Sequence, residues 1–541
     1  MKFNLIKYFR RNEDKISFYF IVCLFAIFAF LLILVNSKGN ILGKSFGDVY
    51  SYLIAALRFS GVSIEGYQQI NNLAPFIPFL TSFLFRLGFI GSSSIFFITG
   101  VFYFLGGVFF YKLLRLRFNN LYSILGAVLY GSCTVNLIWQ ATAIVDIPAV
   151  ALSIIAIYST MMAVDKNQKY FYIAFPVFVL AFLSKYSAAL ILPIMILYYI
   201  LRVFSWKKFK TYKKNTLIGV ILGIICFIPY ILYLTIYHID FNLYYQLNAI
   251  FTIHKYPLGA VNDLGFYFVN LFHCLNHIEI LGIFLYIIFI FGIVLVLYRT
   301  RRILKVTYNQ QSIKFLNRFV PLSIIYKLLL IGIILLFGIF LTAGRIPIVI
   351  SEVLLFLIIY VMSVLSNKVL GKFNKIPHKT KYKFYNYDII MFTWSYSYLI
   401  MLSAHFIKST SYFSSMAPGF IALVVFSIYL IFKTDKLKDI SLDLKENKRH
   451  DYNIKFSSLA SLLLIFVFIL SSFYCISIDR QDNVQTDGDG IVDFIKDNIT
   501  HYDNLSIQEE NGSIGDYSYY QNGIKLIISY FYGFNQYLII C

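Results

Sequence analysis

Long apolar segments recur along almost the whole chain, and each is close to the length that an α-helix needs to cross a bilayer. The sequence is 59% hydrophobic and only 13% charged, so a soluble fold would leave too much apolar surface in water. Residues 17–35 form the first such segment and lack a small-residue cleavage site, which predicts a permanent anchor. The sequence therefore predicts an all-α polytopic membrane protein.

About thirteen segments have the length and composition of a membrane span. They are residues 17–35, 92–111, 121–141, 148–164, 170–183, 188–204, 217–237, 278–298, 320–343, 348–365, 389–403, 413–432 and 457–475. Clusters of Lys and Arg lie between them at alternate ends, as cytoplasmic loops do. This alternation predicts a multi-pass protein of the plasma membrane with a cytoplasmic N-terminus and an extracytoplasmic C-terminal tail.

The net charge of +21 would suggest a nucleic-acid partner if the chain were soluble. Here the basic residues stand in short clusters between apolar segments, which is typical of cytoplasmic anchors, so no nucleic-acid partner is predicted. The six cysteines are scattered without close pairs, which indicates neither a disulfide framework nor a thiolate metal site.

Two regions follow from this pattern. Residues 1–475 are predicted to form the transmembrane domain, and residues 476–541 an extracytoplasmic polar tail with a small α/β appendage that need not be complete. The first outer loop, 36–72, includes a stretch of mixed polarity, 50–59, that suits a short helix in the membrane interface. Residues 73–87 are too short and too rich in proline for a crossing, which predicts an outer-face or re-entrant helix.

Polar residues from separate loops are predicted to meet at the outer face. A carboxylate there could take the proton of an attacking hydroxyl, while cations stabilise a departing lipid-linked phosphate. That reaction needs no general acid, because the phosphate leaves already charged. The candidates are Asp48, Glu65, Asp146, Lys185, Arg345, His405 and Lys408.

Structural interpretations stand beside these functional ones. Asp146 precedes Pro148 by two residues, as a helix N-cap does. The outer cations could instead extend to lipid headgroups. A carboxylate and three histidines suit either a zinc site or an interfacial group; they are His254, His273, His277 and Glu279. Asp48 has no evident structural partner beside it, which favours a functional role.

These outer-face pieces resemble the GT-C class of membrane glycosyltransferases that use polyprenyl-phosphate sugars. The resemblance is to the branch of dolichyl-phosphate-mannose protein mannosyltransferases and aminoarabinose transferases. The matching pieces are Gly47-Asp48-Val49-Tyr50, the proline-rich residues 74–80, Asp146-Ile147-Pro148, residues 183–187 running into 190–193, and residues 405–413 with Met416 and Pro418.

The resemblance implies a catalytic role for two carboxylates, with Asp48 as the general base and Asp146 as a second acidic residue. It also implies that Lys185, beside Tyr186, contacts the lipid phosphate. Two positions depart from the branch. Val49 stands where many relatives have a second acidic residue, which removes the basis for a paired-carboxylate or metal role there. Ser411 stands where Arg is expected, so Arg345 or Lys408 becomes the phosphate partner, with Glu65, His405 and Tyr412 as accessory residues.

The function expected from these observations is inverting transfer of a sugar from a polyprenyl-phosphate donor to an acceptor hydroxyl at the outer face. The resemblance makes a mannose-like hexose the default sugar. The acceptor is left open among protein, glycan and lipid, and no resident metal is assigned, although a divalent ion stays an open cofactor. The alternatives are a transporter or flippase of lipid-linked sugars and an inactive relative that only binds lipid. A transporter would place ionisable residues near the bilayer midplane, and the predicted spans have few of them. This scarcity favours a reaction at one membrane face over transport.

Overall fold

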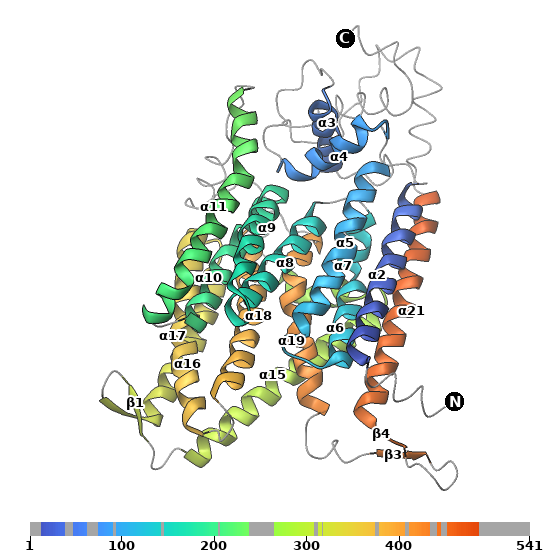
Figure 1. Ribbon diagram of the computed structural model, residues 1–541. Helices are drawn as coiled ribbons and strands as arrows, with labels where there is room; N and C mark the ends of the chain where they lie inside the picture. Colours follow the sequence, from blue (N-terminus) through green and yellow to red (C-terminus); the bar gives the residue numbers. More distant parts are fainter. Residues whose placement is uncertain are drawn as a thin grey trace.

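The described part of the chain is nearly all helical, and most of its helices run side by side in one bundle (Figure 1). The computed structural model describes residues 12–37, 47–61, 74–89, 93–141, 145–203, 206–236, 264–307, 312–315, 318–373, 378–405, 410–432, 441–444 and 452–485. The predicted α/β appendage in the tail, together with Glu65, His254 and Lys408, lies outside these ranges.

The helices and strands have the following bounds. The α-helices are α2 (Glu13–Ser37), α3 (Gly47–Phe59), α4 (Phe76–Arg86), α5 (Ser93–Leu114), α6 (Asn120–Gly131), α7 (Thr134–Ala141), α8 (Asp146–Asp165), α9 (Phe171–Ser184), α10 (Ile191–Val203), α11 (Trp206–Ile236), α13 (Phe266–Val269), α14 (Leu271–Leu275), α15 (Glu279–Thr307), α16 (Leu322–Leu341), α17 (Ile348–Phe373), α18 (His378–Ala404), α19 (Phe413–Phe432) and α21 (Phe456–Gln485). Short 3₁₀ helices are η3 (Gln168–Tyr170), η4 (Tyr186–Leu190) and η5 (Thr410–Tyr412). The strands β1 (Ser312–Phe315) and β2 (Arg318–Pro321) form one antiparallel hairpin, and β3 (Ser441–Leu444) and β4 (Tyr452–Lys455) form another.

Nine helices within the described ranges are long and apolar enough to cross a membrane, which confirms a multi-pass membrane protein. Other apolar helices in these ranges are shorter, such as α9 and the apolar part of α15. Helices account for most of each segment that the sequence marks as a span, but the number of crossings, about thirteen, stays a prediction.

The two ends of the bundle carry different elements (Figure 1). Helices α3 and α4 lie beyond one end, which we call the α3 end, and the strands β1–β4 lie beyond the other, which we call the hairpin end. Helix α4 is short and packs against α3, so the separate short helix predicted within 73–87 is present, while its outer-face or re-entrant placement stays a prediction. Residues 50–59 likewise lie within the helix α3.

The segment 121–141 is not the single helix that the sequence predicts. It consists of α6 and α7, separated at Ser132 and Cys133. An interruption frees backbone carbonyls, and side chains satisfy two of them here. The Tyr103 hydroxyl donates to the Gly131 carbonyl at 2.8 Å, and Asn136 Nδ2 donates to the Tyr130 carbonyl at 2.7 Å. These buried donors make the break compatible with an apolar surrounding.

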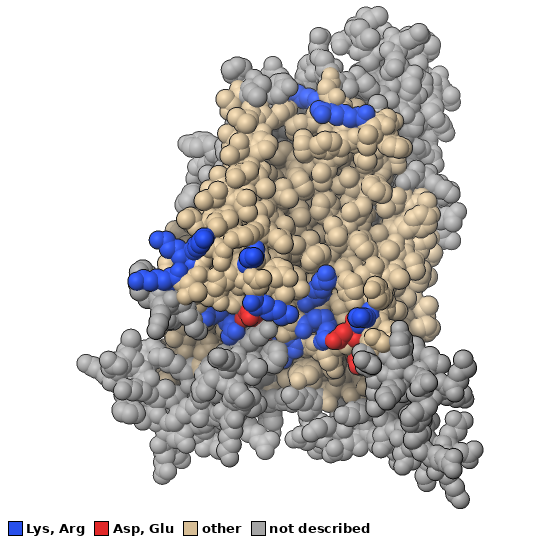
Figure 2. Space-filling model, viewed as in Figure 1, with Lys and Arg blue, Asp and Glu red and all other residues tan. Residues whose placement is uncertain are grey.

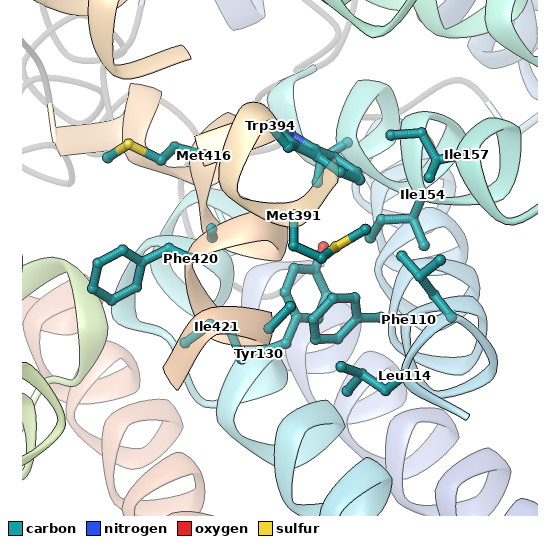
Figure 3. Close-up of a cluster of buried hydrophobic side chains, with 14 of the residues drawn as sticks. Phe110, Leu114, Tyr130, Ile154, Ile157, Met391, Trp394, Met416, Phe420 and Ile421 are labelled. Carbon is teal, nitrogen blue, oxygen red and sulfur yellow. The ribbon is translucent and has the colours of Figure 1, made fainter. Parts of the chain in front are cut away.

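The core lies where α5, α6, α8, α18 and α19 meet (Figure 3). Trp394 of α18 is fully buried there, and its indole Nε1 donates to the Ser415 carbonyl of α19 at 2.9 Å. A Cβ added at Gly419 of α19 would stand 2.6 Å from the Met391 carbonyl oxygen of α18. Only glycine allows this backbone approach, so α18 and α19 are held close together at the centre of the bundle.

Ion pairs tie the helices together toward the hairpin end. Arg115 pairs with Asp14 at 2.9 Å and Arg117 with Asp388 at 3.0 Å, which joins the end of α5 to α2 and α18. Lys and Arg gather toward this end on the face shown in Figure 2, and a wide surface without charges separates them from a few near the opposite end. This distribution is what a membrane-spanning bundle requires.

Candidate functional site

The candidate site is built around an ion pair between α8 and the break that follows α9. Asp146 is the first residue of α8, and Val145, not Asp146, occupies the N-cap position. The backbone of Lys185 is extended, between the end of α9 and the start of η4. Lys185 Nζ donates to Asp146 Oδ1, with side chains 23% and 3% exposed respectively. The capping interpretation of Asp146 is therefore wrong: its carboxylate binds the lysine.

Side chains of η5 and of the start of α19 contact the two members of this ion pair. The Tyr412 ring lies beneath Lys185 Nζ, 4.7 Å from its centroid, and Ser414 Oγ donates to Asp146 Oδ1 at 3.5 Å. His405 lies against Tyr412, with ring centroids 5.8 Å apart. Three segments that are far apart in the sequence thus converge on one lysine. Lys185 does not extend away to a headgroup, as the snorkelling interpretation requires.

A line of aromatic side chains connects this cluster to the α3 end. The hydroxyls of Tyr186 and Tyr230 lie 3.2 Å apart, which joins η4 to α11. One turn further along α11, the Tyr233 ring lies 4.8 Å from that of Phe59, near the end of α3. Arg86 of α4 donates to the Phe59 carbonyl at 2.5 Å and holds the end of α3 in place. The Lys185 cluster therefore lies toward the end of the bundle that carries α3.

Asp48 lies in the first turn of α3, and the described structure covers its backbone only. Phe59, eleven residues later, is about 16 Å further along the helix axis, because an α-helix rises about 1.5 Å per residue. Asp48 is therefore positioned by the same helix that contacts α11, at the opposite end of that helix. Its role as general base stays a prediction.

Arg345 is not brought into contact with Asp146 or Lys185. It is exposed in the turn between α16 and α17, where its backbone N–H donates to the Thr342 carbonyl at 2.9 Å. Gly344 beside it has a φ of +78°, and it lies against Ala404 at the end of α18. The turn is therefore near the end of α18 that leads to His405. Lys408, the other candidate phosphate partner, lies outside the described residues.

The histidines do not form a metal centre within the described ranges. His273 Nδ1 lies 3.6 Å from Glu279 Oε1, and the His277 ring lies 6.3 Å from that of Tyr474. No group of three His, Cys, Asp or Glu side chains is suitably placed for an ion in the part of the chain that the structure describes. His254 lies outside the described residues, so both the interfacial interpretation and the zinc site stay predictions.

Three polar residues on the helices around this cluster were not among the candidates from sequence. Ser414 contacts Asp146, and Tyr398 of α18 donates to the Ser187 carbonyl at 3.2 Å. Glu352 of α17 is buried and accepts a hydrogen bond from Ser397 Oγ at 2.7 Å. Only Glu352 carried a signal that sequence reasoning could have used, because an acidic residue inside an apolar span is uncommon and often functional.

The arrangement suits the binding of an anion. An ammonium group has three hydrogen-bond donors, and Asp146 takes one of them. Asp146 is more deeply buried than Lys185, so the carboxylate fixes the amine from inside while part of the lysine side chain stays accessible. The Tyr412 ring adds an attractive surface for the cation at the same point.

Comparison with known proteins gives a family match over the part of the chain that carries the Asp146–Lys185 pair. Residues 72–233 match the family described as dolichyl-phosphate-mannose-protein mannosyltransferase, a range that includes Asp146, Lys185 and Tyr186. The match confirms, over these residues, the resemblance that the sequence motifs indicate. The crystal structure of ArnT from Cupriavidus metallidurans bound to undecaprenyl phosphate is similar with a TM-score of 0.41 and 12% identity, over 76% of this chain and 77% of that one. No curated protein matches the chain.

Proposed function

We propose that this membrane protein is an inverting glycosyltransferase that moves a sugar from a polyprenyl-phosphate donor to an acceptor hydroxyl at the outer face of the plasma membrane. The default sugar is a mannose-like hexose, and the acceptor is a protein, a glycan or a lipid. The donor is a membrane lipid, so the reaction takes place where the bundle meets the bilayer surface.

The observation that carries this proposal is the ion pair between Lys185 and Asp146. Both residues lie within the range that matches the mannosyltransferase family. A partly exposed lysine, positioned by a nearly buried carboxylate and an aromatic ring, is suited to holding a lipid phosphate near the membrane surface. The aromatic contacts from Tyr186 to Phe59 place this lysine toward the end of the bundle that carries α3 and Asp48.

In the proposed reaction the Asp48 carboxylate accepts the proton of the acceptor hydroxyl, and the oxygen attacks the anomeric carbon of the donor sugar. The bond between that carbon and the phosphate oxygen breaks, and its electron pair goes to the phosphate. Attack opposite to the departing group inverts the anomeric centre. Lys185 stabilises the charge that develops on the phosphate, and Arg345 or Lys408 provides a second cation. Asp146 keeps Lys185 in place and does not itself take a proton.

The test uses membranes that contain either the wild type or the Asp48→Asn variant. Each is incubated with polyprenyl-phosphate sugars that carry labelled mannose, glucose or N-acetylglucosamine, and transfer to endogenous acceptors is measured. We expect the wild type to transfer one of these sugars and Asp48→Asn to lose at least about a hundredfold in rate, because an amide cannot accept the proton. Equal amounts of folded protein must be present in both preparations.

Asp14→Asn is the matched control, because it removes an exposed carboxylate near the opposite end of the bundle. Its transfer rate should equal that of the wild type. An Asp48→Asn variant that keeps full activity would remove the general base from this proposal. A wild type that transfers none of these sugars, yet moves labelled lipid across vesicles, would support a flippase instead.

A further inference from the structure

Glu352 is a buried carboxyl group in the apolar helix α17. Its side chain Oε2 accepts a hydrogen bond from Ser397 Oγ of α18 at 2.7 Å, while Oε1 is enclosed and has no hydrogen-bond partner among the described residues. Within the same ranges no Lys, Arg or His pairs with it. The residue is only 7% exposed. An ionisable group in this state needs an explanation beyond packing.

Burial of such a group is unfavourable in either protonation state. If Glu352 is ionised, Oε1 lacks a donor. If it is protonated, either Oε1 carries a hydrogen that lacks an acceptor, or Oε2 carries the hydrogen and Oε1 still lacks a donor. A hydroxyl group can satisfy both states, since it donates to a carboxylate and accepts from a carboxylic acid. An ammonium group only donates, so it cannot satisfy the state in which Oε1 carries the hydrogen. The chemistry of this position therefore favours a hydroxyl-bearing ligand.

The position of Glu352 connects it to the Lys185 cluster. It stands four residues after the start of α17, about 6 Å along the helix axis, because the rise is about 1.5 Å per residue. Helix α10 packs against both α17 and α18. Tyr398, next to Ser397, donates to the Ser187 carbonyl at 3.2 Å, two residues after Lys185. Neighbouring residues of α18 therefore contact Glu352 on one side and the segment that follows Lys185 on the other.

The turn that leads into α17 carries the exposed Arg345. One continuous segment thus presents a cation suited to a phosphate and, just inside the helix, a carboxyl suited to a hydroxyl. The cation comes before the helix and the carboxyl lies about one turn inside it. The donor lipid has the same order of groups, because its phosphate is followed by a sugar that carries hydroxyls.

We propose that Glu352 Oε1 forms a hydrogen bond with a hydroxyl of the sugar carried by the donor lipid, and so determines which sugar the protein accepts. The inference rests on the proposed glycosyltransferase function and adds a residue that recognises the sugar. Ser397 is a positioning residue, because it holds Oε2 and acts only through Glu352. Since Oε1 is enclosed, the sugar reaches it through a rearrangement of the side chains around it.

The test measures lipid binding to the purified full-length protein in detergent. The probes are labelled polyprenyl phosphate and the same lipid carrying mannose, glucose or N-acetylglucosamine. Glu352→Ala should weaken binding of the preferred sugar-bearing lipid by about tenfold or more, the loss expected for a hydrogen bond to a buried carboxyl. It should leave binding of the bare lipid unchanged. Glu352→Gln, whose amide also donates and accepts, should bind more like the wild type.

Thermal unfolding separates this role from a structural one. Removal of an unpaired buried carboxyl should leave the melting temperature unchanged or raise it, whereas a structural residue should lower it. Ser363→Ala is the control, because Ser363 is a buried polar residue deeper in the same helix, and its lipid binding should not change.

Two failures are distinguishable in this experiment. If the wild type binds neither the bare nor any sugar-bearing lipid, the proposed function is contradicted and this inference with it. If the wild type prefers a sugar-bearing lipid and Glu352→Ala keeps that preference, or loses all binding together with a lower melting temperature, only the inference about Glu352 is overturned.

Discussion

Asp146 and Lys185 face an energetic problem that is common to buried ion pairs. Removing both charges from water costs several kcal/mol, which their attraction offsets only when the geometry is good. Here the tyrosine ring at Lys185 and the serine hydroxyl at Asp146 add contacts to the pair. A pair that contributes little net stability, placed at the meeting point of three segments, is better explained by binding than by folding.

A second pair in α8 provides a matched comparison. Asp165, at the other end of the helix, pairs with Arg202 at 2.7 Å, and these side chains are 5% and 21% exposed, close to the 3% and 23% of Asp146 and Lys185. Asp146→Asn and Asp165→Asn should each lower the free energy of unfolding by about 3 kcal/mol, because each leaves a cation without its partner.

Transfer activity should separate the two variants. Per amount of folded protein, Asp165→Asn should transfer sugar at the wild-type rate, whereas Asp146→Asn should lose at least about tenfold, because Lys185 is no longer held in place. The measurement combines thermal unfolding in detergent with the transfer assay. Equal activity losses in both variants would show that the α8 pairs act on activity only through stability.

The sequence identified the residues of this pair but not their relationship. Asp146 before Pro148 fits an N-cap as well as a site, because both use a carboxylate in the first turn of a helix. The choice depends on Lys185, which is 39 residues away, and local pattern carries no information on such a contact. Ser414 was missed for the same reason, since a serine in an apolar helix has no distinctive spacing.

At the scale of elements, the sequence predicts which segments are helical but not where a helix is interrupted. Apolar length marks a helix in a membrane because its backbone groups must be satisfied internally. The break between α6 and α7 depends on donors from elsewhere, such as Tyr103, and on Asn136 reaching back to Tyr130. The bounds of the short helices α3 and α4 were close to prediction because charge and proline interrupt the apolar pattern there.

The close contact between α18 and α19 gives a prediction for elements. Gly419→Ala should lower the melting temperature, by an amount that corresponds to about 1–3 kcal/mol, because the new Cβ would stand 2.6 Å from a backbone carbonyl that cannot rotate away. Gly338→Ala in α16 is the control, since nothing lies within 4 Å of its added Cβ. Alanine favours a helix over glycine by about 1 kcal/mol, so this variant should be neutral or slightly stabilised.

Thermal unfolding of the two purified glycine variants in detergent checks this expectation. The same melting temperature for Gly419→Ala and the wild type would contradict this prediction, because α18 and α19 would then move apart to make room for the Cβ with no loss of stability. Because α19 also carries Ser414, a shift of this helix should lower sugar transfer as well, and the loss should be larger than for Gly338→Ala.

At the scale of the whole molecule, charge distribution decides which end faces the cytoplasm. On the face shown in Figure 2, Lys and Arg lie mainly toward the hairpin end. At the other end, α3 carries Arg58 and α4 carries Arg86. Basic residues are retained on the cytoplasmic side during insertion. The hairpin end is therefore predicted to be cytoplasmic, which would place the Asp146–Lys185 pair toward the outer face, where a lipid-linked sugar would be used.

Labelling of single cysteines tests this orientation. In a background without the native cysteines, Leu87→Cys places a thiol at an exposed position after α4, and Lys169→Cys places one at an exposed position near the opposite end of the bundle. A membrane-impermeant maleimide should label Leu87→Cys in intact cells and Lys169→Cys only after permeabilisation, because a charged reagent does not cross the bilayer. The reverse pattern would place the candidate site on the cytoplasmic side and contradict transfer at the outer face. Labelling of both in intact cells would mean that the two positions share one face, which contradicts a bundle in which α8 crosses the membrane from the Asp146–Lys185 pair to the end that carries Lys169.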